Sequence, residues 1–204
     1  MIAGGLAAFA RMLSGASVRW TTPVTGARQR IWFGNHSSHL DFVLIWSALP
    51  RELRATARPV AGADYWGRGP IRRYVACNVF HAILVDRSDG PATPERASAA
   101  IDSIATQMGP GESIIVFPEG TRSRTGELLP FKSGMYHLSK RKPGVELVPV
   151  HLANLSRILP KGEMLPVPLH GRIVFGAPMY LEDGETKDAF LGRARAALLA
   201  LKDA

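Results

Sequence analysis

The chain has 204 residues, of which 46% are hydrophobic and 21% charged, a balance that supplies a sizeable core and excludes a disordered or collagen-like protein. A single cysteine, Cys77, excludes an internal disulfide, and no cysteine or histidine spacing fits zinc, so we expect no metal site. The net charge of +8, with 19 arginines and 6 lysines, favours anionic partners, and the excess of arginine favours phosphate groups.

Residues 1–20 form an amphipathic N-terminal segment, which we separate from a domain over residues 21–204. Four apolar side chains share one face at helical spacing: Ile2, Leu6, Phe9 and Leu13. The segment is not typical of a signal peptide, because Arg11 follows the apolar stretch instead of preceding it. Two interpretations stay open: the segment lies in a membrane interface as a helix, or it packs on its own domain.

Short apolar runs alternate with helical patterns along the rest of the chain. The runs predict strands at residues 30–34, 82–85, 113–117, 147–152 and 172–175. The helical patterns cover residues 41–49, 94–108, 133–140 and 186–202, with Pro94 as the first residue of its helix. This alternation predicts a single α/β domain with a central, mostly buried sheet flanked by helices. In such sheets ligands bind at strand ends.

The loop after the first predicted strand carries His36, and Asp41 opens the next helix. On one continuous helix, residues five apart lie about 140° from each other and cannot share a proton. With His36 in the loop and Asp41 in the first helical turn, the carboxylate accepts from one ring nitrogen and leaves the other nitrogen free to take a proton. A second interpretation stays open, because Ser38-x-x-Asp41 is also typical of a helix start that needs no catalytic partner. We expect His39 to be structural.

The loop after the strand at residues 113–117 suits a phosphate group. Pro118 cannot donate to a strand ladder and ends the strand, and Gly120 permits close approach of a ligand. Thr121 and Arg122 supply a hydroxyl, an amide and a guanidinium. The alternative is an ordinary tight turn.

A second guanidinium follows the strand at residues 82–85. Arg87 comes directly after that strand, and we expect it to reach the same anion if the two strand ends are neighbours. The alternative for Arg87 is a surface ion pair with Asp86 or Asp89.

Taken together and in this order, these segments resemble the glycerolipid acyltransferase family, whose bacterial type member is lysophosphatidic acid acyltransferase. Residues 35–41 (NHSSHLD) resemble the His-x4-Asp motif of that family, and residues 117–123 (FPEGTRS) resemble its acceptor-binding motif. Three shorter segments match in the same way: Val85-Asp86-Arg87, Phe131-Lys132-Ser133-Gly134 and Val148-Pro149-Val150. The resemblance spans roughly residues 28–175.

The resemblance implies a fold like that of glycerol-3-phosphate acyltransferase and an O-acyltransferase activity. A fatty acyl group would move from a thioester, acyl-CoA or acyl carrier protein, to a hydroxyl of a lysophospholipid. The expected acceptor is 1-acylglycerol-3-phosphate, which gives phosphatidic acid. No cofactor is expected besides the thioester co-substrate, and the absence of a Gly-x-Ser-x-Gly motif agrees with direct attack without a covalent enzyme intermediate.

The resemblance also assigns roles to residues. His36 would be the general base and Asp41 would orient it, while backbone amides beside His36 are candidates for stabilising the oxyanion. The acceptor would be held by four consecutive residues, Glu119, Gly120, Thr121 and Arg122, and its phosphate by Arg87 and Arg122.

One departure limits what the resemblance says about the acceptor. Many family members have Ala-Lys-Lys-Glu-Leu where this chain has Ala-Gly-Ala-Asp-Tyr at residues 61–65, so an expected basic side chain is missing. Two alternatives therefore stay open: an acyltransferase of the same type with another lysolipid acceptor such as an aminolipid, and a non-catalytic basic lipid-binding module.

The positive charge also bears on partners and location. No nucleic-acid-binding motif is present, so we expect no nucleic acid partner. We expect peripheral binding to an anionic membrane surface on its cytoplasmic side. The residues expected to bind it are the N-terminal segment and arginines such as Arg51, Arg54, Arg72 and Arg73.

Overall fold

The computed structural model describes residue 5 and residues 15–24, 26, 28–38, 41–86, 93–123, 125–153 and 171–203. The described strands are β1 (Ser17–Trp20), β2 (Arg30–Gly34), β3 (Ala57–Gly62), β4 (Ile83–Val85), β5 (Ser113–Val116), β6 (Glu146–Ala153) and β7 (Arg172–Phe175). The described helices are α2 (Asp41–Ala48), α3 (Arg51–Thr56), α4 (Ala63–Trp66), α5 (Pro70–Tyr74), the π-helix η1 (Val75–Val79), α6 (Pro94–Gln107), α7 (Gly134–Arg141) and α8 (Lys187–Leu199).

The described strands form one sheet in the order β1-β7-β6-β2-β5-β3-β4. The five adjacent strands from β6 to β4 run parallel, whereas β7 is antiparallel to β6 and β1 is parallel to β7. The carboxyl ends of β2, β5 and β3 therefore meet at one edge, which is where ligands bind in sheets of this kind.

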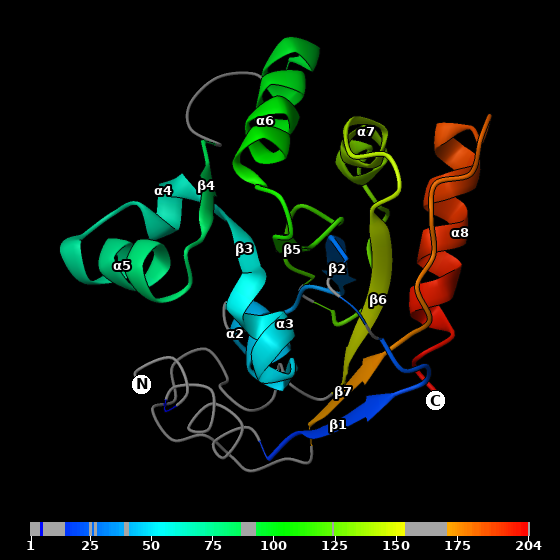
Figure 1. Cartoon of the computed structure of the whole chain (residues 1–204), viewed down its shortest axis with the longest axis horizontal. Coiled ribbons are helices and arrows are strands. Elements are labelled where there is room, and N and C mark those ends of the chain that lie inside the picture. The colour runs from blue at the N-terminus through cyan, green and yellow to red at the C-terminus, as the bar shows by residue number, and fades with distance from the viewer. Residues whose placement is uncertain are drawn as a thin grey trace.

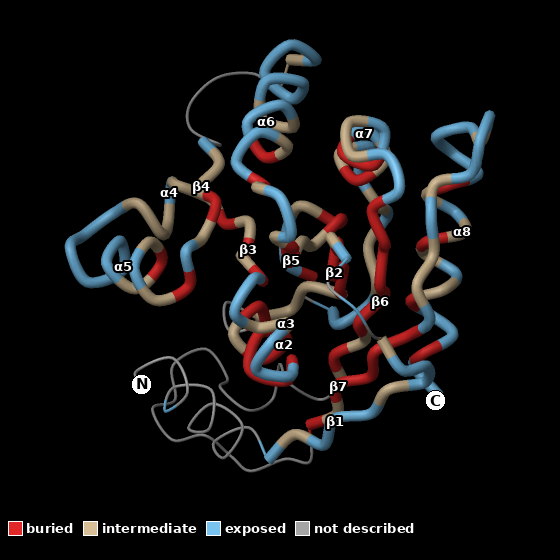
Figure 2. The backbone as a smooth tube through the Cα atoms, viewed as in Figure 1, coloured by how far each residue is buried: buried red, intermediate tan, exposed pale blue. Residues whose placement is uncertain are grey.

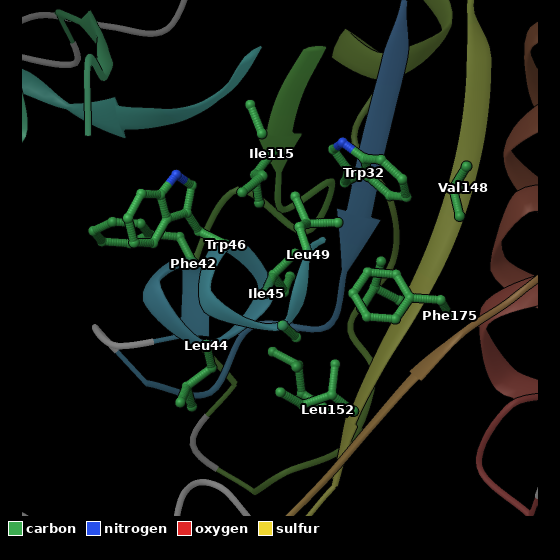
Figure 3. Close-up of a cluster of buried hydrophobic side chains, with 14 of the residues drawn as sticks. Trp32, Phe42, Leu44, Ile45, Trp46, Leu49, Ile115, Val148, Leu152 and Phe175 are labelled. Atoms are coloured by element: carbon green, nitrogen blue, oxygen red, sulfur yellow. The ribbon is translucent and has the colours of Figure 1, made fainter. Parts of the chain in front are cut away.

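Two hydrophobic cores cover the two faces of the sheet. Side chains alternate along β2, so Trp32 belongs to one core and its neighbours Ile31 and Phe33 belong to the other. Figure 3 shows the first core, in which Ile45 of α2 packs among side chains of the sheet. Helices α6, α7 and α8 cover the opposite face (Figure 1). The buried positions concentrate in the central strands, as Figure 2 shows.

The structure confirms the predicted α/β class, all five predicted strands and all four predicted helices, with ends that differ by at most a few residues. Helices α6 and α8 begin as their sequences indicate, because Thr93 and Thr186 each accept a hydrogen bond from a backbone amide of the first turn. Strands β1 and β3 and the short helices between α2 and β4 were not predicted. Strand β3 contains Arg58 and Pro59, which weaken its strand pattern.

The N-terminal segment is only partly described. Its last residues, Ser17–Trp20, form β1 and pair with β7, so the sheet begins inside the segment that we had separated from the domain. The residues of its apolar face, Ile2, Leu6, Phe9 and Leu13, lie outside the described residues. No described helix is long and apolar enough to cross a membrane.

Candidate active site

His36 and Asp41 meet at the carboxyl end of β2. The distance between His36 Nδ1 and Asp41 Oδ2 is 2.9 Å. The Asp41 side chain is fully buried, whereas 21% of the His36 side chain is exposed. With Nδ1–H donated to the carboxylate, Nε2 carries the ring lone pair, and none of the described residues hydrogen-bonds it. The pair thus has the geometry of a base and its orienting group, and its catalytic role stays a prediction.

The same carboxylate oxygen also fixes the loop that carries His36. Asp41 Oδ2 accepts hydrogen bonds from the backbone amides of Ser37, at 2.6 Å, and Ser38, at 2.7 Å. The bond from the Ser38 amide is half of a capping box, so the two interpretations of Asp41 hold together. Asp41 starts the helix and orients the imidazole with one oxygen.

Glu119 joins the two polar loops from within the protein. Glu119 is only 2% exposed. Its Oε1 accepts a hydrogen bond from the His36 amide at 2.7 Å, and its Oε2 accepts one from the Leu129 amide at 2.8 Å. Burial raises the pKa of the Glu119 carboxyl above its usual range. With both oxygens bound to backbone amides, Glu119 positions the loop that carries His36. Its predicted contact with an acceptor stays a prediction.

Three backbone amides at and after His36 already have partners. His36 donates to Glu119, and Ser37 and Ser38 donate to Asp41. These three amides are therefore not free to stabilise an oxyanion in this arrangement, because each already binds a buried carboxylate. The sequence could not reveal this, since Glu119 lies 83 positions away from His36. The oxyanion donors stay unassigned.

Neighbouring residues hold the imidazole in place. The ring of Phe117 stacks on the His36 ring with centroids 4.2 Å apart and planes 14° apart. The His36 carbonyl accepts from the Ser123 amide at 2.8 Å, so the second loop contacts both sides of the first. At Gly34 an added Cβ would lie 3.0 Å from the Val150 carbonyl oxygen, which explains a glycine where β2 ends.

The loop after β5 presents cationic and hydroxyl groups to solvent. Gly120 has a φ of +68°, and its amide donates to the Phe117 carbonyl at 3.0 Å, which turns the chain sharply. Thr121 and Arg122 follow it and are exposed. Among the described residues, the guanidinium of Arg122 has neither a hydrogen-bond nor an ion-pair partner.

Lys132 is a residue of this region that the sequence did not single out for a role. An added Cβ on Gly120 would lie 2.9 Å from Lys132 Cδ and 3.0 Å from Nζ, so the lysine side chain lies directly over the turn. The Lys132 amide also donates to the Pro118 carbonyl at 2.8 Å. The Lys132 ammonium group is thereby placed beside the loop after β5, which contains Gly120.

Two predicted residues of the region lie outside the described residues, namely Arg87 and His39. Strand β4, which precedes Arg87, is separated from β5 by β3, so the two strand ends are not neighbours in the sheet. The condition under which we expected Arg87 and Arg122 to reach one anion is therefore not met, and the structural role of His39 stays a prediction. In the part of the chain that the structure describes, no group of three or more His, Cys, Asp or Glu side chains could hold a metal ion.

Comparisons with known proteins agree with this architecture. The sequence profile of the Acyltransferase family matches residues 18–153. The 1-acyl-sn-glycerol-3-phosphate acyltransferase of Limnanthes douglasii is 31% identical over 145 residues, which cover 70% of this chain and 48% of the plant protein. The human 1-acyl-sn-glycerol-3-phosphate acyltransferase alpha is 30% identical over 129 residues, 63% of this chain and 42% of its own. The chain thus spans about half the length of these relatives.

A solved structure shares the fold. The crystal structure of the 1-acyl-sn-glycerophosphate (LPA) acyltransferase PlsC from Thermotoga maritima superposes with a TM-score of 0.73. The match covers 99% of this chain and 78% of that one, at 19% sequence identity.

Proposed function

Because this chain belongs to the acyltransferase family, we propose that it transfers a fatty acyl group from a thioester to a hydroxyl group of a lysophospholipid. The proposed donor is acyl-CoA or acyl carrier protein, and the proposed acceptor is 1-acylglycerol-3-phosphate, which becomes phosphatidic acid. The single observation that carries the proposal is the His36–Asp41 pair, with Nδ1 held at 2.9 Å and Nε2 left without a partner among the described residues. The names of the similar plant and human proteins support the same acceptor.

The proposed mechanism uses His36 twice. Its Nε2 removes the proton from the acceptor hydroxyl as the hydroxyl oxygen attacks the thioester carbonyl carbon. Asp41 stabilises the imidazolium that forms, through the hydrogen bond to Nδ1–H. When the tetrahedral intermediate collapses, the carbon–sulfur bond breaks and the leaving thiolate takes the proton back from Nε2. The base is thereby regenerated without any cofactor entering the balance.

The acceptor phosphate is proposed to bind at the turn around Gly120. Arg122 is exposed and Lys132 lies over the turn, and among the described residues neither cation is committed to a carboxylate. Guanidinium and ammonium groups form charge-assisted hydrogen bonds with phosphate oxygens. Lys132 also supplies a basic group in a chain that lacks the paired lysines expected at residues 62 and 63.

The activity is tested with purified protein, an acyl-CoA donor and a panel of lysolipid acceptors. Thiol release that requires lysophosphatidate, together with phosphatidic acid detected by mass spectrometry, is the expected result. Release with an aminolipid acceptor alone would replace the acceptor, and no acceptor-dependent release with acyl-CoA or with acyl carrier protein would leave a non-catalytic lipid-binding module as the better description.

Charge recognition is tested with Arg122→Ala and Lys132→Met. Each should raise KM for lysophosphatidate at least about tenfold, since a hydrogen bond to a charged group contributes roughly 1.5–3 kcal/mol. The KM for monoacylglycerol should rise far less. The control is Lys187→Met, which removes a lysine of α8, outside the proposed phosphate site. Its Nζ lies 3.8 Å from Asp188 Oδ1. Equal losses on both acceptors would mean that these residues support the loop instead of the phosphate.

A further inference from the structure

Residues 68–74 form a surface feature that the proposed reaction does not use, and we name it the α5 protrusion. All seven residues are exposed. Ile71 is 78% exposed and Tyr74 is 59% exposed, the highest values among the exposed large hydrophobic side chains of the described residues. In Figure 1 helix α5 lies at the outer side of β4, away from the helices that cover the sheet, and in Figure 2 it is drawn largely as exposed.

The α5 protrusion is strongly basic. It contains Arg68, Arg72 and Arg73, and the sequence has no acidic residue from Tyr65 to Val85. The Arg72 guanidinium carbon lies 4.6 Å from the centre of the Tyr65 ring. Single exposed apolar residues are common on protein surfaces, but here two of them stand within four positions, surrounded by cations. Such a combination is typical of surfaces that bind anionic lipid.

The α5 protrusion follows the edge of the sheet at which His36 and Asp41 lie. Helix α4 begins directly after β3, whose carboxyl end lies at the same edge as that of β2. Trp66, the last residue of α4, packs against Phe42 of α2 with ring centroids 5.3 Å apart. Phe42 is the immediate neighbour of Asp41. A surface bound to the α5 protrusion therefore lies on the side of the molecule where a lipid acceptor has to arrive.

We propose that the α5 protrusion docks the protein on an anionic membrane, with Ile71 and Tyr74 entering the interface and Arg68, Arg72 and Arg73 binding lipid phosphates. A lipid surface fits better than a protein partner, because a stable protein interface takes about 20–30 residues from each partner, whereas the α5 protrusion has seven. Insertion of two side chains and neutralisation of three cations need no complementary shape.

The test measures binding of the full-length protein to vesicles without any turnover, so it fails or succeeds independently of the proposed reaction. Vesicles contain phosphatidylcholine alone or phosphatidylcholine with phosphatidylglycerol. Ile71→Ser/Tyr74→Ser should weaken binding to the anionic vesicles at least about tenfold, because the loss of buried apolar area costs roughly 25 cal/mol per Å². Arg72→Gln/Arg73→Gln should weaken it about tenfold or more, at about 1 kcal/mol for each arginine near the surface.

Salt separates the two contributions. At about 1 M salt, where the Debye length is about 3 Å, the deficit of the arginine variant should largely disappear while the deficit of the apolar variant persists. Leu199→Ser is the matched control, since Leu199 of α8 is also exposed, at 39%, and lies outside the α5 protrusion. A midpoint of thermal unfolding equal to that of the wild type shows that a variant is folded. The conservative variant Ile71→Leu should bind the vesicles as the wild type does.

Unchanged vesicle binding in both double variants would overturn the proposal. If the same variants also lose binding of acyl carrier protein, the α5 protrusion is instead a protein-docking surface.

Discussion

At each end of β2 a basic side chain is bound to a buried carboxylate, but the two pairs differ in how fully their atoms are bound within the protein. Arg30, the first residue of the strand, pairs with the buried carboxylate of Glu146 at 2.8 Å, and His36, two residues past its end, pairs with the buried carboxylate of Asp41 at 2.9 Å. Arg30 is 1% exposed and its other guanidinium contacts include the Gly26 carbonyl. The second oxygen of Glu146 accepts from the Tyr180 hydroxyl at 2.9 Å.

The difference between the ends lies in which atoms are left open. Both Glu146 oxygens and the Arg30 guanidinium are bound within the protein, so this pair can only hold β2 against β6. His36 donates through Nδ1 and keeps Nε2 open, with 21% of its side chain exposed. Buried charge alone therefore does not mark a site, whereas a buried charge that orients a partly exposed partner does.

We call the carboxyl end of β2 the open end, because His36 Nε2 has no partner there among the described residues. The largest expected effect is at this end, with Asp41→Asn. The amide still starts the helix but favours the wrong imidazole tautomer, so kcat should fall by roughly 10⁴-fold, as in other His–Asp pairs. Steady-state kinetics and thermal unfolding of the same sample check this. A loss of less than about tenfold would mean that Asp41 only caps α2.

At the closed end, the amino end of β2, Arg30→Met should lower the free energy of unfolding by up to about 3–5 kcal/mol, because the buried Glu146 loses its buried partner and keeps only the exposed Arg28, whose Nη1 lies 3.3 Å from Oε1. Arg30→Met/Glu146→Leu should recover much of this stability, since the poorly compensated buried charge is gone. Urea unfolding measures both variants. A large loss of kcat in the folded double variant would contradict a purely structural role.

Glu119→Gln changes how the loop at the open end of β2 is held. A glutamine amide can accept only one of the two backbone hydrogen bonds, so one buried N–H is left unpaired at a cost of about 1–3 kcal/mol. We expect that loss in unfolding experiments together with a lower kcat. Glu127→Gln, at an exposed position of the neighbouring loop, is the control. Unchanged stability with a raised KM would instead make Glu119 an acceptor-binding residue.

The smallest effect concerns His151 of β6. Burial, followed by the nearby charges of Arg172 and Lys202, holds the pKa of His151 below its ordinary value of 6.5, while Asp203 opposes the shift. The unfolded chain then binds the proton more readily, so the free energy of unfolding should fall as the pH drops below 6.5. The slope cannot exceed one proton, or about 1.4 kcal/mol per pH unit. His151→Asn should flatten that part of the profile, and an unchanged profile would assign the acid sensitivity to other groups.

The sequence predicts the open end of β2 better than the closed end. Strand-to-helix alternation places His36 in a loop and Asp41 in a first turn, because local patterning alone sets where β2 ends and α2 begins. The pairing of Arg30 with Glu146 depends on the register between β2 and β6, and that register is fixed by the packing of residues 116 positions apart. Local patterns contain no such information.

The same limit applies around the site. Lys132 over Gly120 and Glu119 beneath the His36 amide both arise where two loops meet, and loop conformations are set by tertiary contacts. Strand β3 was missed because Arg58 interrupts its apolar pattern, although its guanidinium is bound to the His81 and Gln107 carbonyls. A charged residue can be assigned to a strand only when the groups that bind its side chain are known.

The most direct test of the account is a paired measurement of kcat and of the free energy of unfolding for His36→Ala, alongside Arg30→Met. We predict that His36→Ala loses at least about a hundredfold in kcat, while its free energy of unfolding falls by only about 1–3 kcal/mol, because Asp41 keeps its bonds from the Ser37 and Ser38 amides. Arg30→Met should show the reverse pattern, with its stability lost and the kcat of its folded fraction nearly retained. Retention of more than about a tenth of the wild-type kcat in His36→Ala would contradict the account, because a general base contributes more than that.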